Sequence, residues 1–310
     1  MSDQSIKKNV REFYDRVGWQ TVSGDLYQNA EYEDLRPVSH EYIHRCHMRI
    51  NRHLAKEGEY LLDAGSGPVQ YPEYLTYSEG YHARVCMDIS IVALQEARKR
   101  LGDKGLYVVA DITNLPFKPE VFDGIVSLHT IHHVPMEDKL PAYEELYRTL
   151  KSGRSMVVVN GWTNAPLMAW MKHLMSFMRR FRGWWLRKVK KQTPAQTAVE
   201  QASISEKKAE ETKPEQGKPA GTYVHKLNAE WLTQALRGRM DYEILVWRSV
   251  SVGFLRSVIY PEWGGKFWLK VIYGLEELFP RWLGRIGQYP LVVVEKPLPE
   301  NAGANEASKV

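Results

Sequence analysis

The sequence is poor in cysteine and has no long uncharged apolar run. Cys46 and Cys86 are the only cysteines among 310 residues, and they form no Cys-x-x-Cys pair. This usage argues against a disulfide framework or a structural zinc site and fits a reducing compartment. No stretch approaches the roughly 18 uncharged apolar residues of a membrane span. The polar N-terminus has no apolar core typical of a secretory signal. We therefore expect a cytoplasmic protein.

Acidic residues are absent from one segment, where the positive charge is concentrated. Residues 165–191 carry eight Lys or Arg and no Asp or Glu. The net charge is +5, so the remaining chain sums to 5 − 8 = −3. A general polyanion-binding surface would spread its charge, and this basic face has few aromatics that could stack on bases. No nucleic-acid partner is expected.

What is present is an alternation of short apolar runs and helical patterns over residues 60–161, which is typical of parallel βαβ units. Helical spacing is found at Ile91–Leu101, Glu137–Leu150 and Ala229–Leu236. The predicted strands are Tyr60–Ala64, Arg84–Met87, Tyr107–Ala110, Phe122–Leu128, Ser155–Val159, Tyr242–Val250 and Leu291–Glu295. The sequence therefore predicts an α/β fold, a Rossmann-like doubly wound seven-stranded sheet with helical insertions.

Composition divides the chain further. Residues 192–221 have no aromatics, three prolines and mixed charge, so they cannot bury enough surface to offset the entropy of ordering. The predicted parts are an N-terminal helical lid (1–50), the core (51–162), a basic amphipathic helical insertion (163–191), a flexible linker (192–221), the completion of the sheet (222–300) with a helical insertion at 251–288, and a disordered tail (301–310).

Three acids close three consecutive predicted strands. Asp63 precedes Gly65 and Gly67, whose missing side chains let the backbone approach a ligand. Asp88 closes the second strand, where a carboxylate can accept both hydrogen bonds of a ribose diol. Asp111 closes the third and can accept from an adenine amine. Each acid alone could be a helix cap, but the three together indicate a nucleoside-containing cofactor.

The motifs resemble a known family. LLDAGSGP, VCMDIS, VVADITNLPF, FDGIVSLHTIHHV and ELYRTLKSGRSMVVVNGW are similar to successive motifs of class I S-adenosylmethionine (SAM)-dependent methyltransferases of the UbiE/type 11 group. The chain has Pro68-Val69-Gln70 where many members have a third glycine. The resemblance implies SAM as cofactor, with Asp63 and Gly65 beside its methionine, Asp88 on its ribose, Asp111 and the Ile112 backbone at adenine, and Leu128 and His129 near its sulfonium.

Histidines are the obvious local bases for removing a proton from an acceptor, because their ordinary pKa is about 6.5. His132 and His133 are preferred over His129, although all three could simply pack around the cofactor. No acid or cysteine accompanies them, so a metal site is not predicted. Further candidates are Tyr223 and His225, as a second pair near the acceptor, and Tyr14 and Trp19, which resemble a lid over SAM or else pack in the core.

On a helix at about 100° per residue, residues 165–191 place their aromatic, Met and Leu side chains on an arc of about 200°, opposite most of the cations. Such a helix can lie in an anionic bilayer interface. It can equally pack on the sheet as a substrate cap with solvated charges. The membrane is favoured because acid-free runs of this length are unusual on cap helices.

The sequence thus predicts a SAM-dependent methyltransferase, acting preferentially on oxygen, whose acceptor is a lipid, a quinone-like ring or a lipid-linked glycan at the inner face of the membrane. One alternative is a methyltransferase of a small metabolite or sugar. Another is a SAM-binding, membrane-docking protein without turnover. The identity of the acceptor is not encoded in these motifs, because pocket walls come from variable loops.

Overall fold

The computed structural model describes residues 3–19, 21–23, 26–27, 33–189 and 222–299. A seven-stranded sheet forms its core in the order β5-β4-β3-β6-β7-β9-β8, with β9 antiparallel to both neighbours and the other pairs parallel. Its strands are β3 (Gly58–Ala64), β4 (Tyr81–Asp88), β5 (Gly105–Val109), β6 (Gly124–Leu128), β7 (Arg154–Val159), β8 (Asp241–Arg248) and β9 (Tyr289–Lys296). The predicted fold class is confirmed.

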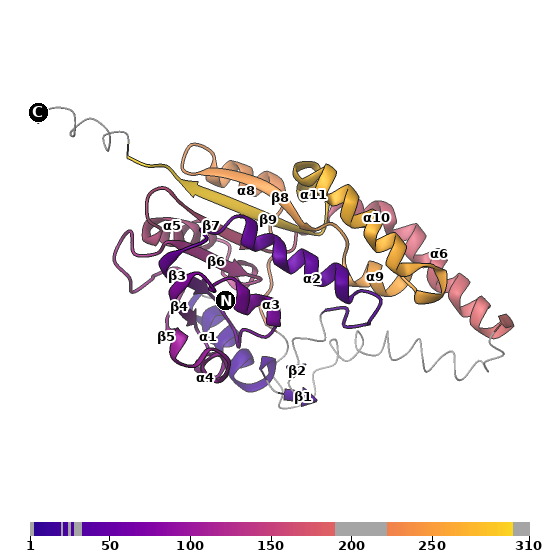
Figure 1. The fold of residues 1–310 in the computed structure, drawn as a ribbon, viewed down its shortest axis with the longest axis horizontal. Coiled ribbons are helices and arrows are strands. Elements are labelled where there is room, and N and C mark those ends of the chain that lie inside the picture. Colours follow the sequence, from indigo (N-terminus) through magenta and orange to yellow (C-terminus); the bar gives the residue numbers. More distant parts are fainter. Residues whose placement is uncertain (1–2, 20, 24–25, 28–32, 190–221, 300–310) are drawn as a thin grey trace, which may run out of the picture.

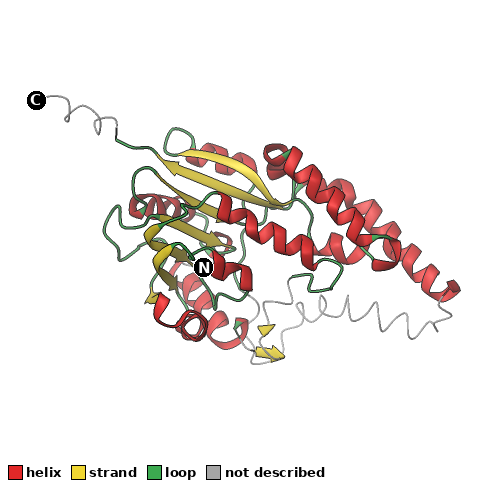
Figure 2. Ribbon diagram, in the orientation of Figure 1, coloured by secondary structure: helices red, strands yellow, loops and turns green. Residues whose placement is uncertain are grey.

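Alternation along the strands divides the core into two layers. In β6, Ile125 faces one layer and Val126 the other, and in β7 Val158 and Val157 do the same. Because successive strand residues point to opposite faces, strands buried on both sides read as continuous apolar runs. Helices α5 (Lys139–Thr149) and α8 (Ala229–Leu236) cover the first face, while α3 (Pro72–Thr76) and α4 (Ile91–Leu101) cover the second (Figure 2).

The predicted elements lie where the periodicity placed them, with small shifts at their ends. Helices α4 and α8 have the predicted bounds, whereas α5 begins at Lys139 rather than Glu137. Strand β6 begins at Gly124, because Phe122 makes only an isolated bridge with Leu150. Strand β8 ends at Arg248, before Ser249 gives its backbone N–H to Glu276.

The N-terminal segment is helical only in part. It contains α1 (Asp3–Phe13), a π-helical turn η1 (Tyr14–Gly18), a small antiparallel pair β1 (Thr21–Ser23) and β2 (Leu26–Tyr27), then α2 (His40–Met48) and η3 (Arg49–Arg52). Short 3-10 turns η4 (Gly102–Lys104) and η5 (Ile131–His133) follow within the core. The predicted linker at 192–221 and tail at 301–310 lie outside the described residues.

A group of helices extends from one end of the sheet (Figure 1). It consists of α6 (Pro166–Val189), α9 (Val252–Val258), η7 (Pro261–Trp263), α10 (Gly265–Leu278) and α11 (Pro280–Ile286). The predicted insertion at 251–288 is thus helical. We call α6, α9, η7, α10 and α11 the cap. Helix α11 rests on β8, where Gly284 has no room for a side chain because a Cβ would lie 2.5 Å from the Leu245 backbone.

A buried carboxylate ties the cap to the sheet. Glu276 of α10 accepts from the Tyr42 hydroxyl at 2.7 Å, from Arg49 at 2.9 Å and from the Ser249 N–H at 2.7 Å. Arg49 also donates to the Trp247 carbonyl at 2.7 Å. Since a buried charge is tolerated only when paired and hydrogen-bonded, this network fixes α2, α10 and the end of β8 relative to one another.

Candidate functional site

The glycine-containing turn after β3 lies at the carboxyl edge of the sheet. Gly65 and Gly67 have φ of 75° and 54°, in the left-handed region that favours glycine. A Cβ on Gly65 would lie 2.2 Å from Thr130 Oγ1, and one on Gly67 would lie 2.9 Å from the Trp19 ring. Both glycines are therefore required by the approach of a second loop and of the N-terminal lid to this turn.

Val69 occupies the position of the missing third glycine. Its φ is 52°, although a β-branched residue rarely adopts a left-handed backbone. The side chain is fully buried in the second core layer. The turn therefore keeps a glycine-like backbone at the cost of local strain, which burial of the valine side chain offsets.

Asp63 has a partner within the protein. Its Oδ2 accepts from Arg84 Nε at 3.1 Å and from the Arg84 Nη2, and both residues are almost completely buried. Arg84 also donates to the Tyr74 carbonyl. The Asp63–Arg84 pair thus joins the end of β3, the middle of β4 and helix α3. A direct contact of Asp63 with methionine stays a prediction.

Asp88 is oriented by backbone donors. Its Oδ2 accepts from the Gly67 N–H and its Oδ1 from the Ser90 N–H, each at 2.9 Å. Burial, with a smaller contribution from Asp63, raises the pKa of Asp88 to about 6 against these hydrogen bonds. The structure therefore places this acid directly beside the glycine turn, as expected for a ribose-binding residue.

Asp111 lies next along the same edge, beneath α1. Lys7 of α1 joins it at 2.8 Å and also joins Asp138 at 2.7 Å, while Thr113 donates to the other Asp111 oxygen. These donors hold the pKa of Asp111 below its usual value despite its burial. Ile112, which follows, is buried in the core.

The N-terminal segment reaches the rest of the edge as well. Asp15 accepts from the Ser90 hydroxyl at 2.6 Å, Trp19 covers Gly67, and Tyr14 stacks on Trp19 at 5.3 Å. With the Lys7–Asp111 pair, these contacts run from the end of β5 to the glycine turn. The segment thus lies where a lid would close over a cofactor, the position expected for Tyr14 and Trp19.

The three histidines lie together after β6. His133 Nδ1 donates to the Tyr223 carbonyl at 2.8 Å, which leaves Nε2 to accept from the Tyr14 hydroxyl at 2.7 Å. His132 Nδ1 pairs with Asn160 Oδ1 at 3.1 Å, and no described residue binds its Nε2. Burial lowers the pKa of His133 to about 4 and that of His132 well below its usual value. Both rings are therefore neutral bases.

His129 differs from its neighbours. Its backbone is left-handed, with φ of 57°, and its N–H donates to the Val159 carbonyl at 2.7 Å. Its ring lies edge-on to Trp247 at 5.3 Å and to Tyr289 at 5.7 Å. Burial and the nearby Arg248 cation lower its pKa to about 3. His129 is thus a turn residue packed among aromatics, beside Leu128 at the end of β6.

Residues 222–227 cross the histidine loop as a strap. The His225 N–H donates to the His132 carbonyl at 2.8 Å, and Lys139 Nζ donates to the His225 and Ile131 carbonyls at 2.7 and 3.0 Å. Burial lowers the pKa of Lys139 to about 8. The His225 side chain is exposed, so both members of the predicted second pair meet the histidines through their backbones, His225 at His132 and Tyr223 at His133.

A model of the type 11 methyltransferase domain family matches residues 62–158. A tRNA (carboxymethyluridine(34)-5-O)-methyltransferase of Arabidopsis thaliana is 28% identical over 52% of this chain and 44% of its own length. The UbiE C-methyltransferase of ubiquinone and menaquinone biosynthesis in Vibrio campbellii is 27% identical over 51% and 68%. Residues 62–158 therefore form a SAM-dependent methyltransferase domain similar to those of the UbiE/type 11 group.

Solved structures agree with this fold. Geranyl diphosphate C-methyltransferase from Streptomyces coelicolor superposes with a TM-score of 0.50 at 13% identity, covering 94% of this chain and 97% of that one. The chain spans only about two fifths to two thirds of the length of the two curated relatives given above. The match to the methyltransferase domain family confirms the domain and its SAM cofactor, both of which the motifs predicted.

The geometry of the domain fits this cofactor. The glycine turn lies at the carboxyl edge of the sheet beneath Trp19 of the lid, Asp88 stands beside it with its carboxylate already oriented, and Asp111 follows at the same edge. Asp88 would hold the ribose, and Asp111 with the Ile112 backbone would hold adenine. Bound SAM would supply an activated methyl group, and these residues would orient it.

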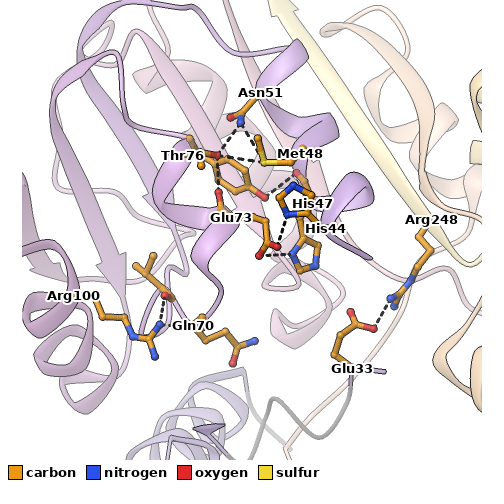
Figure 3. A network of polar contacts seen from close by, with 12 residues as sticks. Glu33, His44, His47, Met48, Asn51, Gln70, Glu73, Thr76, Arg100 and Arg248 are labelled. Carbon is orange, nitrogen blue, oxygen red and sulfur yellow. Dashed lines mark hydrogen bonds and ion pairs between the residues drawn. The ribbon is translucent and has the colours of Figure 1, made fainter. Parts of the chain in front are cut away.

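Sequence reasoning missed a buried cluster at the opposite end of this edge (Figure 3). Arg248, at the end of β8, pairs with Glu33 and lies 4.6 Å from the Tyr289 ring. His47 of α2 stacks on Trp247 at 5.2 Å, and its Nδ1 faces Glu73 at 3.5 Å. Arg248 stands inside the apolar run LVWRSV, and this could have identified it from the sequence. The sequence around Glu33 has no comparable signal.

Proposed function

We propose that the protein transfers the methyl group of SAM, preferentially to an oxygen of a lipid, quinone-like or lipid-linked acceptor, while docked on an anionic membrane. The observation that carries the membrane part is an apolar stripe left uncovered on α6. We call it the α6 stripe, and it consists of Trp170, Leu174, Phe177, Phe181 and Trp184, whose side chains are between 37% and 61% exposed.

The predicted apolar arc of α6 divides into two halves. Met171 and Met175 pack against α9 and α10 in the third core cluster, and Trp185 lies edge-on to Trp263 at 5.8 Å. The residues of the α6 stripe recur at spacings of three and four, so at about 100° per residue they occupy an arc of about 80° beside this packed half. The two interpretations of the segment are thus compatible: one half is cap, and the other is available to a membrane.

The exposed cations of α6 have no carboxylate partners among the described residues. At about 100° per residue, Arg180 and Arg187 border the α6 stripe, whereas Lys172 and Arg179 lie on the opposite side of the helix. Lys172, Arg179, Arg180 and Arg187 are exposed, and none lies within ion-pair distance of an acid among the described residues. By contrast Arg182, on the packed half, pairs with Glu262 and lies 4.0 Å from the Tyr260 ring. Unpaired cations beside exposed aromatics match the chemistry of anionic headgroups over acyl chains.

A second apolar stripe on α10 and α11 supports the same proposal. Its members are Phe267, Trp268, Val271, Leu275, Leu278, Phe279 and Trp282, with exposed fractions from 37% to 72%. Lys266 and Lys270 are exposed on the same helix. Scattered exposed apolar residues are normal, but large contiguous patches mark interaction surfaces. Within the described residues, no helix is apolar and long enough to cross a bilayer.

The acceptor-activating base is proposed to be His132. Its Nδ1 is engaged with Asn160, which leaves the Nε2 lone pair to accept a proton from an acceptor hydroxyl. His133 has both ring nitrogens bound and positions the lid through Tyr14. The UbiE relative is named for quinone biosynthesis and the Arabidopsis relative for tRNA, so total lipids and total tRNA are the acceptors to compare.

Membrane docking is tested by co-sedimentation of the full chain with vesicles of phosphatidylcholine alone or with added phosphatidylglycerol. Binding should rise with phosphatidylglycerol and fall with salt, because exposed charges are screened over about 8 Å at physiological ionic strength. Phe177→Ser with Trp184→Ser should weaken binding at unchanged charge, since each loses apolar contact with the acyl region.

The matched control is Met171→Ser, on the packed half of the same helix. It should lower the melting temperature and leave vesicle binding of the folded protein unchanged. Equal binding to neutral and anionic vesicles, or to neither, would remove the membrane from the proposal and leave a methyltransferase of a dissolved acceptor.

A further inference from the structure

The aromatic cluster at the end of β8 and the start of β9 holds more positive than negative charge. Tyr289 is its centre, with the Arg248 guanidinium 4.6 Å from the ring and the His129 and Trp247 rings 5.7 and 5.8 Å away. Glu33 pairs with Arg248. A second cation, Lys226 of the strap, lies beside Gly161, as Tyr289 does.

Lys226 and Tyr289 both lie close to Gly161, which has no side chain. A Cβ on this glycine would lie 3.4 Å from both Lys226 Nζ and the Tyr289 Cε1 atom, so the amine and the ring flank one point. Lys226 is partly buried and makes no hydrogen bond or ion pair with any described residue. Burial lowers its pKa, as expected for an ammonium group without a counter-ion.

Two N–H groups in the cluster also have no acceptor among the described residues. Arg248 Nε and Trp247 Nε1 are buried without a partner there, in residues only 2% and 1% exposed. Leaving a buried donor unsatisfied is costly, and native proteins rarely tolerate it. Lys226, Arg248 and Trp247 therefore offer N–H donors to a group that the protein does not itself supply.

The electrostatic environment of the cluster agrees with an excess of positive charge and N–H donors. Burial and the positive charges of Arg248, His47 and Lys226 lower the pKa of His129, while Glu33 opposes them. Around His129 the cluster thus holds the cations Arg248 and Lys226, the carboxylate Glu33 and the titratable ring of His47. A ligand bearing one negative charge would balance the cluster and occupy its unpaired donors.

We propose that the acceptor carries an anionic group, a phosphate or a carboxylate, that binds between Lys226 and Arg248 against Tyr289. The inference rests on the proposed methyl transfer and narrows its acceptor. It favours a phosphorylated lipid, a lipid-linked glycan or a ring carboxylic acid over a neutral quinone. Lys226 and Arg248 are then specificity-determining residues, and the anion fixes the position of the reacting oxygen.

The inference is tested first by anion binding, without methyl transfer. The full chain, saturated with S-adenosylhomocysteine in phosphate-free buffer, is titrated calorimetrically with phosphate monoester (phenyl phosphate), benzoate and neutral phenol. We expect one of the two anions to bind and phenol to bind at least tenfold more weakly. Preference for phenyl phosphate assigns a phosphorylated acceptor, and preference for benzoate assigns a carboxylic acid.

Variants locate the binding. Lys226→Met should weaken the preferred anion about ten- to hundredfold, the effect of losing a charged hydrogen bond, whereas Lys226→Arg should stay close to wild type. Lys118→Met is the matched control, because Lys118 is exposed on a loop of the core and has no ion pair among described residues. It should leave anion binding unchanged. Equal binding by wild type and Lys226→Met would overturn the site.

A second measurement separates this inference from the proposed function. Total lipids are divided on an anion-exchange resin and incubated with methyl-labelled SAM and the protein. Label in the retained acidic fraction, with an increased KM and similar kcat for Lys226→Met, supports both. Label confined to the unretained fraction keeps the methyltransferase and overturns the anionic acceptor. No label in lipids, with anion binding intact, overturns the lipid acceptor alone.

Discussion

The cofactor edge and the cap differ in how their polar and apolar groups are satisfied. At the cofactor edge every strand-end acid already has donors: Arg84 for Asp63, two backbone N–H groups for Asp88, and Lys7 for Asp111. On the cap, the α6 stripe is partly exposed, and Arg179 and Arg180 have no carboxylate partner in the part of the chain that the structure describes. The first region is preorganised for a small ligand, and the second is complementary to something outside the chain.

This difference has an energetic meaning. Substitutions at the cofactor edge break buried, mutually dependent contacts. They should therefore lower turnover, the free energy of unfolding or cofactor affinity. Changes on the α6 stripe touch little within the protein and should be felt only when a membrane is present. The following predictions separate the two regions, in decreasing order of expected effect.

The largest effect is expected at His132. His132→Ala should lower turnover about 10²–10⁴-fold with SAM affinity nearly unchanged, because a positioned base contributes this much to proton transfer. Since the pKa of the ring is already far below its usual value, wild-type turnover should not fall as pH drops through 6.5. Single-turnover rates measured between pH 5.5 and 8 check both points. A His132→Ala protein with near wild-type rates would show that the base is another group.

Arg84→Met should destabilise the fold by about 3–5 kcal/mol, because it leaves the Asp63 carboxylate buried without its cation. Arg98→Met, at an exposed position of α4, is the control and should change the unfolding free energy by less than about 0.5 kcal/mol. Urea denaturation measures both. Equal effects of the two substitutions would contradict the role assigned to the Asp63–Arg84 pair.

Asp88→Ala should weaken SAM binding by about 1.5–3 kcal/mol, the effect of losing a charged hydrogen-bond partner. Because the pKa of Asp88 is raised to about 6, wild-type affinity should also fall as pH decreases below about 6, where the carboxyl takes up a proton. The raised pKa of Asp88 also affects stability. The contribution of Asp88 to the free energy of unfolding is greatest below its ordinary pKa and is lost as pH rises to about 6.

Calorimetric titration of SAM between pH 5 and 8 tests the Asp88 prediction, with Asp88→Asn as the control that cannot titrate. The variant should bind weakly with no slope below pH 6 arising from this position. An unchanged affinity in a folded Asp88→Ala protein would remove Asp88 from the cofactor site.

The smallest effect concerns the strain at Val69. Val69→Gly removes a buried side chain but frees a left-handed backbone, whereas Val157→Gly removes an equally buried valine from a regular strand. Val69→Gly should therefore be less destabilising by at least about 1 kcal/mol. Thermal denaturation of the two variants, measured side by side, compares their losses of stability. Equal losses would mean that the turn is not strained.

Much of the fold could be predicted because its signals are local. The apolar runs and strand-end acids fixed the order of Asp63, Asp88 and Asp111 along one edge, and the helical spacing at Ile91–Leu101 gave α4 its observed bounds. The parallel strands bring their carboxyl ends together, so acids far apart in sequence become neighbours.

The partners of those acids could not be predicted, because they come from distant segments. Lys7 reaches Asp111 from the N-terminal helix, and Glu33 reaches Arg248 across more than two hundred residues. The α6 arc was predicted as one face because periodicity counts apolar positions without saying which are covered. Only the packing of Met171 and Met175 on the cap separates the covered half from the exposed one.

The most direct test of the account is methyl transfer on membranes. Vesicles made from total lipids with added phosphatidylglycerol are incubated with methyl-labelled SAM and either the wild-type protein or the Phe177→Ser, Trp184→Ser double variant. We expect label in the lipid fraction with wild type, at least tenfold less with the variant, and equal SAM affinity for both. Label appearing at the same rate with both proteins, or in tRNA or dissolved metabolites and not in lipid, would contradict an acceptor reached from the membrane.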